Sequence, residues 1–226
     1  CKRIRHSLLF ADLLRVDHFR GFESYWAIPA DSATAREGRW LPGPGDKLFD
    51  ALQRRLGSLP IVAEDLGVIT PEVDALRDRW GMPGMVVLQF AVFEDGFEIS
   101  QIAENRVCYT GTHDNDTTVG WFYGSNDDPR SDHDIHWTQQ AALALTGGPP
   151  ETIATDLVRT AFASNARLAI APMQDFLGLG SDARLNTPGS AGGNWRWRLI
   201  AAQMTDELCD NVEGAVRASK REAHND

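Results

Sequence analysis

The chain has 226 residues, of which 42% are hydrophobic and 24% charged, a composition typical of a soluble globular protein. Its 32 acidic and 22 basic residues give a net charge of −10, which argues against a general nucleic-acid binder. No window approaches 18 uninterrupted apolar residues, so a membrane span is not predicted. The scattered Cys1, Cys108 and Cys209 suggest neither a disulfide framework nor a zinc site, and we expect a reducing, cytoplasmic location.

Five short apolar segments predict buried strands of a parallel sheet. In chain order they lie at residues 13–16, 61–63, 85–90, 107–111 and 168–171. Continuous runs rich in branched residues are typical of strands that are covered on both faces. Several of these runs lead directly into polar or charged residues, which places those residues at the strand ends.

Helical periodicity lies between the predicted strands. The pattern predicts helices at residues 45–57, 70–81, 135–148, 150–164 and 205–223. Gly57 is a C-cap candidate, and Thr70 followed by Pro71 is a strong start signal, because it supplies an N-cap and a preorganised first residue. Strands that alternate with helices predict an α/β fold built from βαβ units.

Three carboxylates follow predicted strands. Asp17, Glu64 and Asp114 are separated by 47 and 50 residues (64 − 17 and 114 − 64), enough for a strand-helix repeat in each interval. Active groups of parallel sheets gather at the C-terminal strand ends, so the three could share one rim. Two facing carboxyl groups can cleave a sugar acetal, one as nucleophile and one as proton donor. The same trio could instead bind a divalent metal.

Each carboxylate also has a purely structural interpretation. Arg15 and Asp17 fall on one strand face, where the cation keeps a nucleophile ionised or forms a buried ion pair that holds the strand end. Glu64 could have its pKa raised by desolvation, or could simply open a polar loop. His113 and Asp114 could belong to a turn with local side-chain to backbone bonds.

Four motifs in register decide between these interpretations. RVDHFRGF, IVAEDLG, YTGTHDNDTT and PMQDFLGLGSDARLNTPGSAGGNWRWR resemble, in this order, the motifs of the 4-α-glucanotransferases, or amylomaltases, of glycoside hydrolase family 77. That family belongs to the α-amylase clan of (β/α)8 barrels, and the resemblance covers residues 13–198. It implies a retaining transferase that moves α-1,4-glucan segments between maltooligosaccharides through a covalent glucosyl-enzyme, with no metal or organic cofactor.

The resemblance also implies roles for individual residues. At the matched positions, Asp17 is the nucleophile, Glu64 the general acid/base and Asp114 the transition-state stabiliser. The implied substrate-binding residues are Arg15, which supports the nucleophile, His18 and His113, which hold sugar hydroxyls, and Asn186, which contacts the acceptor side.

By the same resemblance, the five strands correspond to strands four to eight of the barrel. We therefore expect a partial (β/α)8 TIM barrel, in which residues 1–226 form the C-terminal portion of a single catalytic domain and lack strands one to three. The expected partners are α-1,4-glucans and the missing N-terminal part of the same protein, not nucleic acid or a membrane. An α-amylase-like hydrolase and an inactive glucan-binding fragment are the alternatives.

Two further features have both a functional and a structural interpretation. Trp26, Trp40, Trp121, Trp195 and Trp197 could stack on glucose rings, although packing is the commoner role of tryptophan. The DHDIH segment at residues 132–136 has the composition of a metal site but is more typical of a solvated loop and helix start.

Overall fold

The computed structural model describes residues 1–125 and 128–221. The chain forms two compact units: unit 1 comprises Cys1–Met85 and Asn105–Val107, and unit 2 comprises Val86–Glu104 and Cys108–Asp226. Over the described part of the chain, no helix is both long and apolar enough to cross a membrane.

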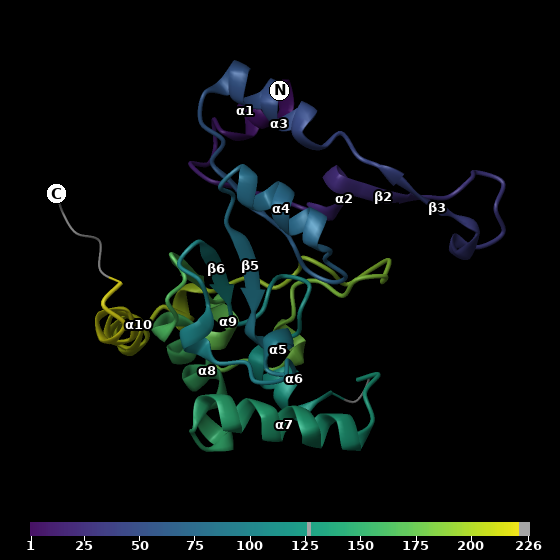
Figure 1. The fold of residues 1–226 in the computed structure, drawn as a ribbon. Helices are drawn as coiled ribbons and strands as arrows, with labels where there is room; N and C mark the ends of the chain where they lie inside the picture. Colours follow the sequence, from purple (N-terminus) through teal and green to yellow (C-terminus); the bar gives the residue numbers. More distant parts are fainter. Residues whose placement is uncertain (126–127, 222–226) are drawn as a thin grey trace. The chain divides into compact units, whose positions relative to one another are not determined.

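Unit 1 alternates short strands with helices (Figure 1). Its elements are α1 (Lys2–Ser7), β1 (Leu14–Val16), α2 (Arg20–Glu23), β2 (Ser24–Ala27), η1 (Ala35–Glu37), β3 (Arg39–Pro42), α3 (Gly45–Leu56), β4 (Ile61–Ala63) and α4 (Pro71–Arg79). β1 and β4 pair in parallel, with Val16 opposite Ala63. The predicted strands at 13–16 and 61–63 are therefore confirmed, with β1 one residue shorter.

The helices α3 and α4 confirm the local signals in the sequence. α3 ends at Gly57, which has a φ of 81° and so adopts the left-handed region that favours glycine. α4 begins with Thr70 as N-cap and Pro71 in its first turn. Both helices bury apolar side chains in one core, which contains Phe19, Phe49, Leu52, Ile61, Ala63, Val73, Leu76 and Met82.

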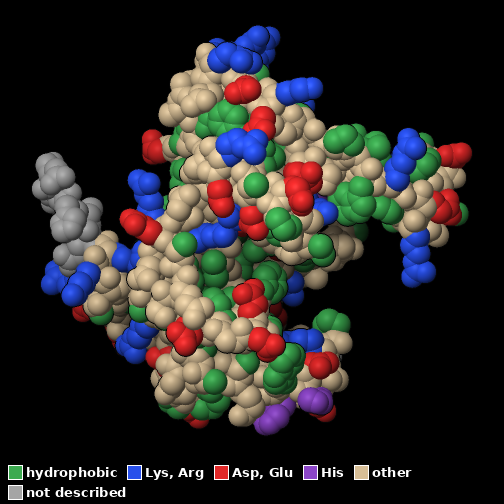
Figure 2. Space-filling view, viewed as in Figure 1, with side chains coloured by type: hydrophobic (Ala, Val, Ile, Leu, Met, Phe, Trp, Pro, Cys, Tyr) green, Lys and Arg blue, Asp and Glu red, His purple; other side chains and the backbone are tan. Residues whose placement is uncertain are grey.

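The β2–β3 hairpin was not predicted. Its strands are antiparallel, and Trp26 lies opposite Trp40 with ring centroids 5.4 Å apart. Figure 1 shows the hairpin extending beyond α2, and Figure 2 shows hydrophobic side chains gathered along it. Trp26 is 40% exposed and Trp40 51% exposed, so neither is a core residue within this unit.

Unit 2 is predominantly helical. Its elements are α5 (Leu88–Ala91), η2 (Ile99–Gln101), α6 (Thr118–Tyr123), α7 (Asp132–Thr146), η3 (Pro150–Thr152), α8 (Ile153–Ala163), β7 (Leu168–Ile170), α9 (Met173–Phe176), η4 (Ser181–Ala183), η5 (Ala201–Gln203) and α10 (Asp206–Ala218). α8 is central, because it packs against α6, α7, α9, α10 and β7. Its buried Leu157 and Ala161 join Trp121 and Cys108 in the core, and burial raises the pKa of the Cys108 thiol to about 11.

Three predicted strands end earlier than expected, and the one predicted at 168–171 ends one residue early, at Ile170. β5 (Gly84–Val87), β6 (Arg106–Tyr109) and β7 form a three-stranded sheet in that order. The predicted strand at 85–90 is wrong beyond Val87, because α5 begins at Leu88. The predicted strand at 107–111 regularly pairs only to Tyr109, although Thr110 still donates its N–H to the Ile170 carbonyl at 3.3 Å.

The helix predicted at 135–148 begins three residues earlier, at Asp132. Ser131 caps it: the Ser131 hydroxyl accepts the N–H of Asp134, and the Asp134 carboxylate accepts the N–H of Ser131. This reciprocal capping satisfies two otherwise unpaired donors at the helix N-terminus. The interpretation of DHDIH as a helix start is therefore confirmed. The solvated loop expected in this segment is instead the first turn of α7.

Candidate functional site

Asp17 and Glu64 follow paired positions of two parallel strands. Because Val16 lies opposite Ala63, the next residue of each strand emerges at the same edge. The backbone pairing continues past the strands: Glu64 N donates to the Val16 carbonyl at 3.0 Å, and Phe19 N donates to the Glu64 carbonyl at 3.0 Å. Asp17 and Glu64, two of the three predicted carboxylate residues, therefore follow the C-terminal ends of two adjacent strands.

The predicted contact between Arg15 and Asp17 is confirmed. Arg15 Nη1 lies 3.0 Å from Asp17 Oδ1. The Asp17 side chain is 77% exposed within the described structure, so the alternative of a buried ion pair is wrong. An accessible carboxylate beside a cation is placed as a nucleophile requires.

The Glu64 carboxylate is held by backbone donors on both oxygens. His18 N donates to Glu64 Oε2 at 2.7 Å, and Leu66 N donates to Oε1 at 3.1 Å. His18 adopts a left-handed φ of 51°, a conformation that costs energy for a non-glycine residue and clusters at functional sites. Gly21 leaves room for this arrangement, since a Cβ there would lie 2.9 Å from the His18 ring.

Asp65, the residue after the predicted acid/base, is buried in an ion network. Its Oδ2 accepts from Arg77 Nη1 at 2.5 Å and Arg106 Nη1 at 2.6 Å, and its Oδ1 accepts from Met85 N at 2.7 Å. Gly84 packs so closely that a Cβ there would lie 2.2 Å from Asp65 Oδ2. This carboxylate is fully engaged, so its role is structural.

Asp114 lies in a hydrogen-bonded cluster of unit 2. Asn186 Nδ2 donates to Asp114 Oδ1 at 2.6 Å, and His113 Nε2 lies 3.4 Å from Asp114 Oδ2. The Asp114 side chain stays 44% exposed. The structure therefore brings together the three predicted site residues of this unit.

Two further residues join this cluster: Arg184 was missed in the sequence, and Trp195 was predicted there as a possible sugar contact. Arg184 Nη2 donates to the Asp114 carbonyl at 2.7 Å, and Arg184 Nε donates to the Asn186 carbonyl at 2.9 Å. The Trp195 ring lies 5.3 Å from the His113 ring between centroids. Both residues occur in the long fourth motif, but nothing in their spacing indicates these partners.

The turn with local side-chain to backbone bonds, expected after β6, is present in the structure. Asn115 Oδ1 accepts from Thr112 N at 2.9 Å and from Thr112 Oγ1 at 2.8 Å, a local bonding pattern typical of polar turns. Asp116 accepts from Thr117 N and from the Ser181 hydroxyl at 2.8 and 2.7 Å. Its carboxylate is thus held by donors of its own neighbour and of the segment at Ser181.

Asp175 on α9 is a buried carboxylate of unit 2. Its side chain accepts from Thr110 Oγ1 at 2.6 Å and from Thr118 N at 2.8 Å, and the residue is 1% exposed. Burial raises the pKa of the Asp175 carboxyl, and these hydrogen bonds only partly oppose the shift. These contacts join Thr110, which follows β6, to Thr118, the first residue of α6. The enclosed carboxylate is not accessible to a substrate.

We expect Asp175→Asn to reduce the pH dependence of stability. A raised folded pKa gives stability that is complete below the unfolded pKa of about 3.9 and is lost as pH rises through the folded value. Asn stays neutral and keeps an acceptor for Thr118 N, so its free energy of unfolding relative to wild type should increase with pH. Urea unfolding followed between about pH 4 and pH 7 measures this trend.

Asp128→Asn is the control of opposite sign. Hydrogen bonds from Arg130 lower the pKa of Asp128, so its stabilisation is present above the unfolded pKa and is lost as pH falls through the folded value. This variant should be less stable than wild type near neutral pH and approach it in acid. A difference between Asp175→Asn and wild type that does not vary with pH would contradict the prediction.

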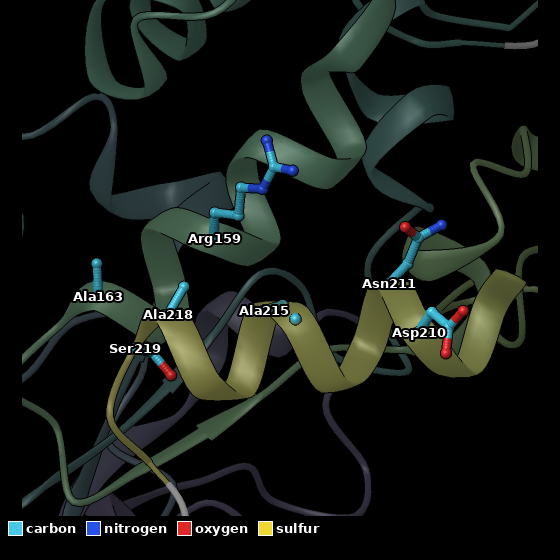
Figure 3. A pocket seen from close by; sticks show the side chains of 8 residues that line it. Arg159, Ala163, Asp210, Asn211, Ala215, Ala218 and Ser219 are labelled. Carbon is cyan, nitrogen blue, oxygen red and sulfur yellow. The ribbon is translucent and has the colours of Figure 1, made fainter.

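Two cavities in unit 2 differ in their relation to the motifs. A cavity of about 20 Å³, enough for one water molecule, is lined by Thr112, His113, Asn115, Asp116, Thr117, Pro172, Gln174, Arg184 and Leu185. A larger groove of about 520 Å³ lies between α8 and α10 (Figure 3) and is lined mainly by small side chains such as Ala163 and Ala218. No predicted site residue lines the larger groove among those described.

Among residues 1–125 and 128–221, no group of three or more His, Cys, Asp or Glu side chains is arranged to hold a metal ion. Asp134 of the DHDIH segment instead caps α7. Of the tryptophans, Trp121 is buried in the core, which confirms its packing role. The proposed sugar contacts of the others stay predictions.

An α/β fold with carboxylates at the ends of parallel strands is an arrangement that enzymes of many chemistries share, glycoside-cleaving enzymes among them. The family model described as 4-alpha-glucanotransferase matches residues 1–203. The 4-alpha-glucanotransferase of Thermus thermophilus is 46% identical over 97% of this chain and 44% of its own length, and that of Synechocystis is 51% identical over 93% and 41%. The chain belongs to the 4-α-glucanotransferase family.

A solved structure supports the same fold. The amylomaltase from Streptococcus agalactiae in complex with acarbose is 33% identical and matches with a TM-score of 0.87 over 98% of this chain and 44% of its own. The chain is therefore an α/β enzyme segment of the barrel type found in amylomaltases. It spans less than half the length of these relatives.

Proposed function

We propose that the full-length protein containing this chain is a 4-α-glucanotransferase that moves α-1,4-glucan segments between maltooligosaccharides with retention of configuration. The observation that carries the proposal is the paired position of Asp17 and Glu64 at the ends of β1 and β4. Retaining glycosidases need two carboxyl groups about 5–5.5 Å apart, and the backbones of neighbouring strands, about 4.8 Å apart, start the two side chains within reach of that separation.

The first step breaks the bond between the anomeric carbon and the glycosidic oxygen. Glu64 gives its proton to the leaving oxygen, and an oxygen of Asp17 attacks the anomeric carbon to form a glycosyl ester. Arg15 supports the nucleophile through its contact with Asp17 Oδ1 at 3.0 Å. The positive charge that develops on the sugar ring is stabilised by Asp114.

The second step transfers the glycosyl group to an acceptor. The ionised Glu64 takes the proton of the acceptor 4-hydroxyl, whose oxygen attacks the anomeric carbon and releases Asp17. His18 and His113 hold sugar hydroxyls near the cleavage point, and Asn186 contacts the acceptor side. Water in place of the acceptor would make the protein an α-amylase-like hydrolase, the alternative within this chemistry.

The finer assignments of the fold belong to the same proposal. We assign β1, β4, β5, β6 and β7 to strands four to eight of a (β/α)8 barrel, and residues 1–226 to the C-terminal portion of its single catalytic domain. The proposed partners are α-1,4-glucans and the remaining part of the barrel, and the proposed location is the cytoplasm. The acarbose complex of the Streptococcus agalactiae relative supports a glucan-like ligand.

Incubation of the full-length protein with maltotriose tests the proposal. Transfer converts two maltotriose molecules to maltopentaose and glucose, and further rounds give a ladder of longer products. Hydrolysis gives only maltose and glucose, and in ¹⁸O-labelled water it places the label at each new reducing end. Shortening with label uptake and no ladder would establish the hydrolase, and no turnover together with acarbose binding would establish a glucan-binding protein.

A further inference from the structure

We propose that Arg184 is a positioning residue, which holds the Asp114 carboxylate and the Asn186 amide in one fixed arrangement. The proposal rests on the proposed function, because that function gives Asp114 and Asn186 their catalytic purpose. Arg184 acts through these two residues rather than on the sugar itself.

The guanidinium of Arg184 spans the two residues whose side chains bond to each other. Its Nη2 donates to the Asp114 carbonyl at 2.7 Å and its Nε donates to the Asn186 carbonyl at 2.9 Å. The Asn186 amide then donates to Asp114 Oδ1 at 2.6 Å and closes a ring of contacts. A guanidinium presents its donors in fixed directions, so the ring sets the separation of the two backbone segments.

This ring matters because both segments are loops. Asp114 lies in the turn after β6, and Asn186 lies in the irregular segment that follows η4. Loops are less restrained than strands, and the 44% exposed Asp114 side chain is not fixed by packing. An error of about 1 Å in a catalytic group can cost about a hundredfold in rate, so a clamp that joins the loops has a direct effect on turnover.

A second connection runs beside the first. The Leu185 carbonyl, between Arg184 and Asn186 in the chain, accepts from Trp195 N at 2.6 Å, and the Trp195 ring packs on His113. The segment at Arg184 is thus tied to the segment at Asp114 at two points. The connection through Arg184 contacts Asp114 directly, whereas the connection through Trp195 contacts the neighbouring His113.

Substitutions in the full-length protein test the role through transfer from maltotriose. We expect Arg184→Ala to lower kcat by about 10- to 100-fold with a change in KM below about threefold, because the sites are displaced rather than removed. Arg184→Lys should recover part of kcat, since an ammonium donates to carbonyls but lacks the planar fork. Arg159→Ala is the matched control, because Arg159 is 67% exposed with one 3.4 Å ion pair.

A double-mutant cycle separates positioning from loop stability. If Arg184 acts through Asn186, Arg184→Ala combined with Asn186→Ala should lose about as much kcat as the worse single variant. Additive losses would overturn the proposal. So would a kcat for Arg184→Ala within about twofold of wild type with only a lowered melting temperature, the result of a merely structural role. If Arg184→Ala does not fold, Arg184→Lys replaces it in the cycle.

The side-chain amide signal of Asn186 gives a readout that does not depend on activity. In ¹⁵N-asparagine-labelled protein, Arg184→Ala should shift this signal and speed its exchange with water, while Arg159→Ala should not. The Asn165 amide, which donates to Ser100 in the same unit, is the internal control. An Asn186 signal that is unchanged in Arg184→Ala overturns the proposal at any activity. If the signal changes but the wild-type protein shows no turnover, the proposed function alone is refuted.

Discussion

Asp17→Asn is expected to lower transfer from maltotriose by at least about a thousandfold, because an amide oxygen cannot replace the carboxylate that forms the glycosyl ester. The folded state should change little. The Asp17 side chain is 77% exposed and its contact with Arg15 is an accessible ion pair, a kind of interaction worth about 0–1 kcal/mol. Initial rates on the full-length protein, together with its urea unfolding curve, measure both effects.

Asp12→Asn is the matched control for this prediction. Asp12 is an exposed aspartate that precedes β1, five residues before Asp17 and outside every motif. Its replacement removes the same charge from the same unit and should leave the rate within about twofold of wild type. Undiminished turnover in Asp17→Asn would refute the assignment of the nucleophile.

The stereochemistry of azide rescue separates the nucleophile from the acid/base. In Asp17→Gly, azide can attack the anomeric carbon directly, so one displacement would convert an α-linked donor to a β-glycosyl azide. In Glu64→Ala, Asp17 still forms the ester with an activated donor, and azide then gives an α-glycosyl azide after two displacements. The opposite pairing of products and variants would exchange the two roles.

Local signals in the sequence located several elements correctly. Thr70 and Pro71 mark the start of α4, and Gly57 marks the end of α3, because capping depends on a few adjacent residues. Ser131 carried an equally local signal with Asp134, but the apolar periodicity begins only at Ile135, so the helix was predicted three residues late. Capping chemistry was thus a better guide to this boundary than periodicity.

Other elements depend on contacts that no local pattern reveals. The run at 85–90 is apolar throughout, and such a run cannot distinguish a strand from the helix that begins at Leu88. The β2–β3 hairpin joins strands across residues 28–38, far longer than the tight turns that give hairpins a sequence signal. Its register depends on pairing that forms only in the folded chain.

The site divides in the same way. The short apolar runs predicted which carboxylates would follow strands. The spacing of Arg15 and Asp17 predicted that both lie on one strand face, since alternation along a strand is a local property. The partners of Asp114 lie about 70 positions away, at Arg184 and Asn186, and the resemblance supplied only Asn186. The convergence of all three carboxylates on one rim stays a prediction.

The second large effect is expected at Asp65, where Asp65→Ala should lower the free energy of unfolding by about 3–5 kcal/mol. The side chains of Asp65 and Arg77 are only 2% and 6% exposed, so removal of the carboxylate leaves a buried cation without the buried one of its carboxylate partners. Burial alone lowers the pKa of Arg77, but hydrogen bonds and charges from Asp78 and Asp65 outweigh it and raise the pKa. An arginine side chain keeps its proton in proteins, so the cation stays charged when Asp65 is removed and cannot escape the cost by losing its proton.

Two further variants show whether the loss comes from charge or from packing. Asp65→Asn keeps the shape and an acceptor for Met85 N, yet it removes the charge that faces Arg77 and Arg106, so an intermediate loss is expected. Glu213→Ala breaks an exposed ion pair on α10 and should cost less than about 1 kcal/mol. Urea unfolding of the three proteins gives the order Asp65→Ala, Asp65→Asn, Glu213→Ala. Equal losses for Asp65→Ala and Glu213→Ala would contradict the prediction, because the network would then behave as an accessible surface pair.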